Sequence, residues 1–168
     1  MPDAAQQLCL ECGLCCNGVI FADGQLQPED DVARLKELGL KLKCGEKFHQ
    51  PCAAHTKGCC AIYSERPVYC RQFDCALLKS VSSGEISNDQ AVTIIDNART
   101  RAAKVDRLLQ KLGDSDEHSA LVLRFRRTSK ALLNAPTVRE TAALFSELTL
   151  AMHRLNLLLN QKFYPPET

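Results

Sequence analysis

The sequence lacks any long hydrophobic run, and no segment approaches the about 20 apolar residues that are needed to span a bilayer. Its first residues, MPDAAQQLCLECG, have neither the basic segment nor the apolar segment of a secretory signal peptide. An excess of one charge is also missing, because 21 Lys and Arg nearly balance 20 Asp and Glu. This balance argues against a nucleic-acid binder held by bulk charge. The sequence therefore predicts a cytoplasmic protein that has neither a membrane nor a nucleic acid as its partner.

Recognisable catalytic motifs are missing as well. The chain has no glycine-rich phosphate loop, no H-E-x-x-H pair, no Ser/His/Asp order and no sequence typical of SAM or nucleotide binding. It also has no internal repeats. No class of enzyme is indicated by these criteria.

Cysteine is missing from residues 76–168, whereas the first 75 residues contain all ten cysteines of the chain. This contrast divides the 168 residues into a cysteine-cluster region (1–82) and a helical region (83–168), which we expect to pack together as one compact unit. A chain of this length can bury enough surface to fold without disulfides. The cysteines are Cys9, Cys12, Cys15, Cys16, Cys44, Cys52, Cys59, Cys60, Cys70 and Cys75.

The cysteine spacing favours metal binding over disulfides. Thiols are kept reduced in the cytoplasm, where clustered cysteines are more often metal sites than disulfides. Two cysteines separated by two residues can turn both sulfurs toward one ion, and Cys9, Cys12 and Cys15 repeat this spacing. The same spacing occurs in iron–sulfur proteins. The pattern is therefore strong evidence for a metal, without saying which metal.

Two pairs of adjacent cysteines, Cys15-Cys16 and Cys59-Cys60, add a constraint. Neighbouring side chains of an extended backbone point to opposite sides, so one ion cannot easily take both sulfurs. Two alternatives remain for each pair. Either two metal centres lie close together, or one cysteine is a ligand and its neighbour only contacts the centre.

The run Cys9–Cys16, together with CAIYSERPVYCRQFDC over residues 60–75, resembles the CxxCxxCC (YkgJ-like) family of proposed zinc- or iron-chelating proteins. The resemblance covers residues 8–80, and Cys44 and Cys59 are additional to the family pattern. A similar cluster occurs in flagellin lysine methylases. His55 stands where the family often has an apolar residue and is a candidate for an additional ligand. The resemblance implies eight metal ligands, namely Cys9, Cys12, Cys15, Cys16, Cys52, Cys60, Cys70 and Cys75.

Other residues of this motif are expected to surround the centre rather than to bind the metal. Four thiolates around a divalent ion carry a net charge of about −2, so guanidinium groups are favourable neighbours. Arg66 and Arg71 flank Cys70 and are candidates for this role, although both also fit as ordinary surface residues. Tyr63 and Phe73 are expected to shield the centre from water.

Short elements are predicted between the two groups of cysteines. Residues 19–26 read as a hairpin with an Asp-Gly turn, and residues 28–38 as a helix that ends at Gly39. Pro67 suits the first turn of a further helix, with Ser64 as its cap. Cys70 would then lie on this helix and Cys75 near its end.

The second half of the sequence predicts a three-helix bundle. Apolar residues recur with helical spacing over residues 87–112, and further helices are expected at 115–134 and 137–163. Capping boxes are expected at Ser87 and Thr137. The basic cluster of Arg124, Arg126, Arg127 and Lys130 reads as a solvated helix face, and His118 and His153 as structural or exposed residues. The apolar surface of the last helix suffices for a core, a protein partner, self-association or a combination of these.

Together these patterns predict a mainly α protein with an irregular, cysteine-rich first half. The leading functional hypothesis is a metal-binding protein that chelates zinc or iron, with an iron–sulfur cluster as one form of the centre. Metal binding would then also stabilise the fold of the first half. One alternative is an iron–sulfur redox or sensor protein, and the other is a metal-dependent transferase that resembles the methylases.

Overall fold

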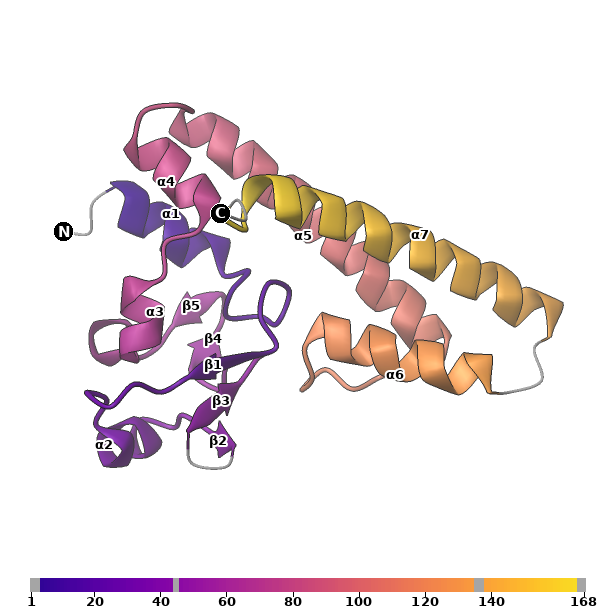
Figure 1. Cartoon of the computed structure of the whole chain (residues 1–168), viewed down its shortest axis with the longest axis horizontal. Helices are drawn as coiled ribbons and strands as arrows, with labels where there is room; N and C mark the ends of the chain where they lie inside the picture. Colours follow the sequence, from indigo (N-terminus) through magenta and orange to yellow (C-terminus); the bar gives the residue numbers. More distant parts are fainter. Residues whose placement is uncertain (1–3, 44–45, 135–137, 166–168) are drawn as a thin grey trace.

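The computed structural model describes residues 4–43, 46–134 and 138–165. Its helices are α1 (Ala4–Cys12), α2 (Val32–Glu37), α3 (Val68–Gln72), α4 (Ala76–Ser82), α5 (Asn88–Lys111), α6 (Leu121–Leu133) and α7 (Arg139–Lys162), with a 3₁₀ turn at Tyr63–Glu65. The predicted mainly α fold is confirmed, with short elements in the first half and three long helices in the second (Figure 1). Within the described ranges, no helix combines the length and the apolar character that crossing a membrane requires.

In the described part of the first half, five short strands form two small sheets. Strands β1 (Asp23–Gln25), β3 (Lys47–His49) and β2 (Leu42–Lys43) make an antiparallel sheet in that order, and β4 (His55–Thr56) pairs with β5 (Cys59–Cys60). The hairpin predicted at residues 19–26 is wrong. Asp23 and Gly24 lie inside β1, where Gly24 faces Phe48, and a Cβ atom on Gly24 would lie 2.2 Å from the ring of Phe48. Glycine is therefore required by close packing and not by a turn.

Two of the three acidic residues directly before α2, Asp30 and Asp31, cap two different helices. Asp31 accepts a hydrogen bond from the backbone N–H of Arg34 at 2.9 Å, so α2 begins later than Pro28, and it ends before Gly39 as predicted. Asp30 instead accepts from the backbone N–H of Val68 at 2.8 Å, which is the first residue of α3. The predicted cap by Ser64 is wrong, because Ser64 lies in the preceding 3₁₀ turn.

The long helices follow the predicted periodicity, with shifted ends. The capping box of Ser87 and Gln90 is present at the start of α5, whereas the one predicted at Thr137 lies outside the described residues. Helix α6 begins at Leu121 and not at residue 115. The reason is a loop in which the carboxylates of Asp114 and Asp116 accept the backbone N–H groups of Asp116 and His118.

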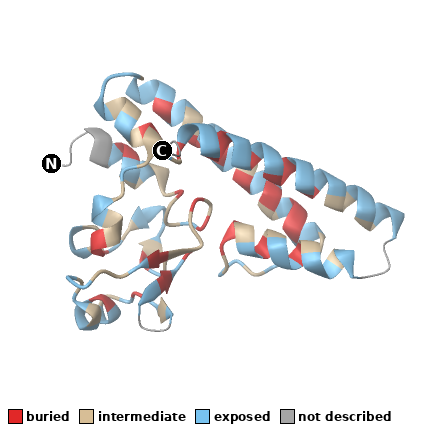
Figure 2. Cartoon of the chain, in the orientation of Figure 1, coloured by how far each residue is buried: buried red, intermediate tan, exposed pale blue. Residues whose placement is uncertain are grey.

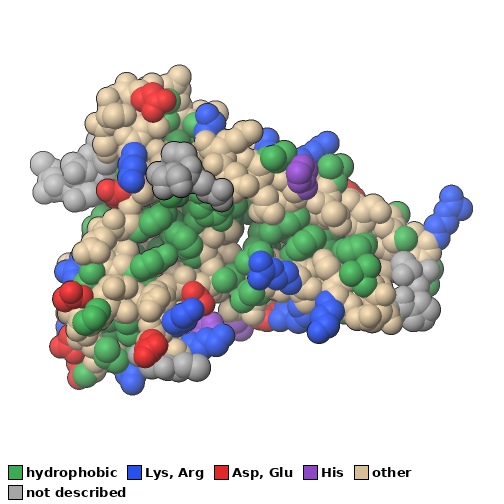
Figure 3. All heavy atoms as spheres, viewed as in Figure 1, with side chains coloured by type: hydrophobic (Ala, Val, Ile, Leu, Met, Phe, Trp, Pro, Cys, Tyr) green, Lys and Arg blue, Asp and Glu red, His purple; other side chains and the backbone are tan. Residues whose placement is uncertain are grey.

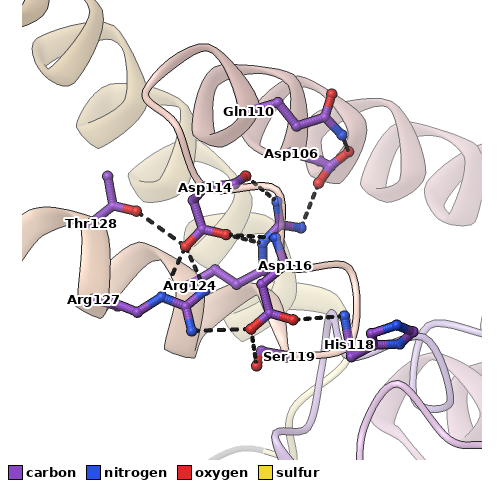
Figure 4. A network of polar contacts seen from close by, with 9 residues as sticks. All are labelled: Asp106, Gln110, Asp114, Asp116, His118, Ser119, Arg124, Arg127 and Thr128. Carbon is purple, nitrogen blue, oxygen red and sulfur yellow. Dashed lines mark hydrogen bonds and ion pairs between the residues drawn. The ribbon is translucent and has the colours of Figure 1, made fainter.

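The prediction that the basic cluster on α6 is a solvated helix face is wrong for two of its four residues, Arg124 and Arg127. Arg124 is only 4% exposed and pairs with Asp106 of α5 and with Asp114, which is also buried (Figure 4). Arg127 binds Asp114 and Asp116. These residues therefore form an ionic network at the junction of α5 and α6, whereas a solvated face was expected; Arg126 and Lys130 are exposed.

Among the described residues, buried side chains form two hydrophobic cores. Figure 2 marks buried residues both along the long helices and in the small sheet of the first half. The larger core joins residues of the first half, such as Leu8, Leu14 and Leu77, to the apolar faces of α5 and α7. The smaller core surrounds Phe48 and includes Leu35 and Ile62. Figure 3 shows hydrophobic side chains gathered on one face over the first half and again between α6 and α7.

Candidate metal centre

The C-x2-C-x2-C-C motif occupies the end of α1 and the turn that follows it. Cys9 and Cys12 lie in the last turn of the helix. Gly13 takes a positive φ of 62°, and its carbonyl oxygen accepts from the N–H of Cys16 at 3.0 Å. Leu14, which is fully buried, fixes this turn in the larger core. The helix end and the tight turn therefore bring the four cysteines to the same place.

The other four cysteines of the family pattern lie near this motif but belong to separate elements. The N–H of Cys52 donates to the carbonyl oxygen of Cys16 at 2.8 Å, which ties the two cysteines together. Cys60 lies in β5 opposite His55, and Cys70 lies on α3 as predicted. Cys75 lies shortly after the end of α3, as predicted, and is also the N-cap residue of α4, where its sulfur accepts from the N–H of Leu78 at 3.4 Å.

Two adjoining cavities contain the eight cysteines of the motif. The first has a volume of ≈ 80 Å³ and the second a volume of ≈ 60 Å³, so each has room for an ion. Cys9, Cys15 and Cys16 line both cavities. The first is also lined by Cys52, Cys60 and Cys70, and the second by Cys12 and Cys75.

The surroundings of these thiols hold them in the neutral form. Burial raises the pKa of Cys12 to about 11 and the pKa values of Cys16 and Cys70 to about 12, from an ordinary value of 9.0. Burial also raises the pKa of Cys15 and Cys52. Neighbouring thiols add to each of these shifts. For Cys12 and Cys52 a hydrogen bond from the backbone, which lowers the pKa, has a larger effect than the neighbouring thiols.

Unpartnered polar groups gather in the first cavity. Among the described residues, the buried side-chain nitrogen or oxygen atoms without a hydrogen-bond partner are Gln50 Oε1, His55 Nε2, Tyr63 OH and Arg66 Nε, and all four residues line this cavity. Buried polar groups are rarely left unpaired in native proteins. This cluster therefore fits a cavity that holds a polar or charged group.

Arg66 has a defined position beside the thiols. Its guanidinium carbon lies 3.8 Å from the ring centroid of Tyr63, and its charge lowers the pKa of Cys9 and of Cys70 against the raising effect of burial. Arg71 is exposed and lines neither cavity. Phe73 lines both cavities and packs edge-on against Phe21, with ring centroids 4.9 Å apart.

The sulfurs do not already form a coordination shell. Within the described ranges, no three Cys, His, Asp or Glu side chains stand together as ligands of one ion, so binding would require the thiols to rotate into the cavities. All nine described cysteines are free thiols. Cys59 is exposed and lines neither cavity, and Cys44 lies outside the described residues.

Arg99 is a residue of this site that the sequence did not reveal. It lies on α5 and donates hydrogen bonds to the backbone carbonyl oxygens of Glu11 and Cys12, at the end of α1. These contacts join residues almost ninety positions apart in the chain. No local pattern could have indicated them, because the periodicity of α5 marks only its apolar face.

Free thiols that line small adjoining cavities are typical of cysteine-rich metal-chelating domains. The chain belongs to the CxxCxxCC family, described as "Putative zinc- or iron-chelating domain", whose model matches residues 8–103, more than half of the chain. The family assignment made from the motif is thus confirmed. Searches of curated proteins and of solved structures found no match.

Proposed function

We propose that this protein chelates zinc or iron through the cysteines that line the two cavities. The observation that carries the proposal is the convergence of these eight thiols, from five separate segments, on adjoining spaces large enough for an ion. Thiolate sulfur is a preferred ligand of zinc and of iron–sulfur clusters. The proposed ligands are Cys9, Cys12, Cys15, Cys16, Cys52, Cys60, Cys70 and Cys75.

The surrounding residues suit such a centre. Arg66 places a positive charge next to Cys9 and Cys70, which would offset part of the charge of the thiolates. His55 and Tyr63 line the first cavity, and their buried Nε2 and OH atoms have no hydrogen-bond partner among the described residues. When bound, the metal would supply the free energy that holds these loop-borne thiols together, and this is folding free energy for such sites.

An iron–sulfur centre with a redox role is the second candidate. The aromatic side chains of Phe21, Tyr69 and Phe73 pack together along the first cavity and would limit the access of water and oxygen to it. This protection favours, but is not specific for, an oxygen-sensitive cluster. Zinc needs no such protection, since it has no redox chemistry.

Anaerobic purification followed by analysis of zinc, iron and acid-labile sulfide tests the proposal. We expect stoichiometric metal in the natural protein and in Cys59→Ser, a control whose altered residue lines neither cavity. Cys70→Ser should contain less metal. Labile sulfide with broad visible absorbance would assign an iron–sulfur centre, and colourless protein with zinc would assign a zinc site. Protein without either metal, with its cysteines paired as disulfides, would contradict the proposal.

A further inference from the structure

We infer that the eight cysteines form two separate four-sulfur centres, one made by Cys16, Cys52, Cys60 and Cys70, and the other by Cys9, Cys12, Cys15 and Cys75. The inference rests on the proposed metal binding and assigns each ligand to a centre. Within the motif, the boundary falls between the adjacent residues Cys15 and Cys16. We call the first set the sheet centre and the second the helix centre.

The two hydrophobic cores make the same division. Cys52, Cys60 and Cys70 pack against the smaller core around Phe48. Cys12, Cys15 and Cys75 pack against the larger core that contains α5 and α7. No cysteine is shared between the two cores, so three thiols of each centre are fixed by a different part of the fold.

The lining of the two cavities divides the cysteines in the same way as the two cores do. Cys52, Cys60 and Cys70 line only the first cavity, and Cys12 and Cys75 only the second. Cys9, Cys15 and Cys16 lie where the two cavities adjoin, and other contacts assign them to a centre.

Cys9, Cys15 and Cys16, which line both cavities, are assigned to a centre by the residues that they contact. Cys16 is bonded through its backbone to Cys52. Cys9 lies three residues before Cys12 in the last turn of α1, and so on the same side of that helix. Cys15 packs against the larger core together with Cys12 and Cys75.

The two centres have different surroundings. The helix centre is enclosed mainly by apolar side chains, including Leu14, Leu77 and Phe163. The sheet centre has the unpartnered polar groups of Gln50, His55, Tyr63 and Arg66 next to it. These groups include N–H and O–H donors, which can hydrogen-bond to metal-bound sulfur. The sheet centre is therefore the one with potential for exchange or reactivity, and the helix centre is the more enclosed.

Single cysteine variants test the assignment in full-length protein purified anaerobically. Cys70→Ser should lose the metal of the sheet centre and Cys75→Ser that of the helix centre, so each should retain about half of the natural content. The double variant should retain almost none, and Cys59→Ser should match the natural protein. One shared cluster predicts instead that either single variant loses all its metal, which would overturn the assignment.

Cadmium reconstitution and hydrogen exchange provide a second measurement where a variant folds poorly. Cadmium NMR of the loaded natural protein should show two sulfur-ligated resonances. Hydrogen exchange should then show loss of protection in residues 46–72 for Cys70→Ser, and in α1 and α4 for Cys75→Ser. A single resonance, or the same exchange pattern in both variants, would contradict two centres. Natural protein that binds no cadmium and contains no zinc or iron would instead disprove the proposed function itself.

Discussion

Cys12, Cys16 and Cys70 have pKa values of about 11 to about 12, because burial disfavours the charged thiolate. All three are therefore protonated near neutral pH when no metal is bound. A metal ion binds the thiolate and not the thiol. Binding therefore releases about one proton for each cysteine that becomes a ligand. The buried thiols thus make metal affinity increase with pH.

The same pKa values predict how the stability of metal-free, reduced protein depends on pH. The unfolded chain loses thiol protons near pH 9.0, whereas the folded chain retains them up to about pH 12. The unfolded state therefore binds fewer protons between these values, and the free energy of unfolding should fall as pH rises from 9.0 to about 12. Below pH 9.0 these thiols should have no effect.

Urea unfolding under anaerobic, chelating conditions on both sides of pH 9.0 measures this dependence. Tyr69 and Tyr164, whose pKa values are also raised by burial, contribute with the same sign. Cys70→Ala is the matched control and should reduce the slope. An unchanged slope in this variant would show that Cys70 is not buried in the metal-free protein.

At the scale of elements, short helices of the first half depend on contacts from distant residues. Helix α3, which carries Cys70, has five residues and no side-chain cap from its own N-cap residue, Pro67. So short a helix is not stable by itself in water. Asp30 supplies the missing cap, since its two carboxylate oxygens accept from Val68 N–H and from Gln27 N–H, each at 2.8 Å.

Replacement of Asp30 by Ala should lower the free energy of unfolding by about 0.5–2 kcal/mol, the range found for lost helix caps. It should also weaken metal retention, because α3 positions Cys70. Glu29→Ala, which alters the exposed neighbour, is the control. Urea unfolding and the metal content after dialysis against a chelator provide the measurements. If both variants had the same free energy of unfolding and the same metal content, Asp30 would not be the cap of α3.

The junction of α5 and α6 depends on a buried charge. Burial raises the pKa of Asp114, but hydrogen bonds from Arg127 and Arg124 lower it more, and the net pKa lies below the ordinary 3.8. The stabilisation is therefore present above pH 3.8 and is lost as the pH falls below this value. The network thus contributes fully near neutral pH.

Arg124→Met should destabilise the protein by about 3 kcal/mol, because it removes the buried partner of the Asp114 carboxylate and leaves only the half-exposed Arg127 beside it. Arg126→Met, at an exposed position of the same helix, should change stability by less than about 0.5 kcal/mol. The double variant Arg124→Met/Asp114→Leu should recover part of the loss. Thermal or urea unfolding of the four proteins checks this, and a double variant no better than Arg124→Met would argue against the ion pair.

At the scale of the whole molecule, the larger core crosses the boundary between the two halves. Leu14 lies between Gly13 and Cys15, yet it belongs to the core formed with α5 and α7. Polar contacts support this junction. Tyr164 OH donates to the carbonyl oxygen of Ile20, and the N–H of Ala76 donates to that of Phe163.

Leu14→Ala should therefore lower the stability of both halves together, by about 2–5 kcal/mol. Leu150→Ala, at a position that is 48% exposed on α7, should have a small effect. Native-state hydrogen exchange distinguishes a global effect from a local one. Loss of protection in the cysteine loops alone, with α5 and α7 unchanged, would show that the two halves are separate folding units.

The sequence by itself determined the cysteine motif, the family and the long helices. Each of these depends on residues close together in the chain: C-x2-C spacing, apolar residues at helical intervals, and the capping box of Ser87 and Gln90. The candidate ligands could be named for the same reason. Their distribution between the two cavities could not, because it depends on which core each cysteine packs against.

Tertiary structure decided the features that join distant residues. Gly24 is in a strand because Lys47–His49 pairs with it, and Arg124 is buried because Asp106 and Asp114 neutralise its charge. Arg99 reaches the end of α1 only because α5 packs there. In each case the local sequence favours another outcome, a turn, a solvated face or a surface arginine. Long-range pairing and burial outweigh these local preferences, and neither can be read from spacing along the chain.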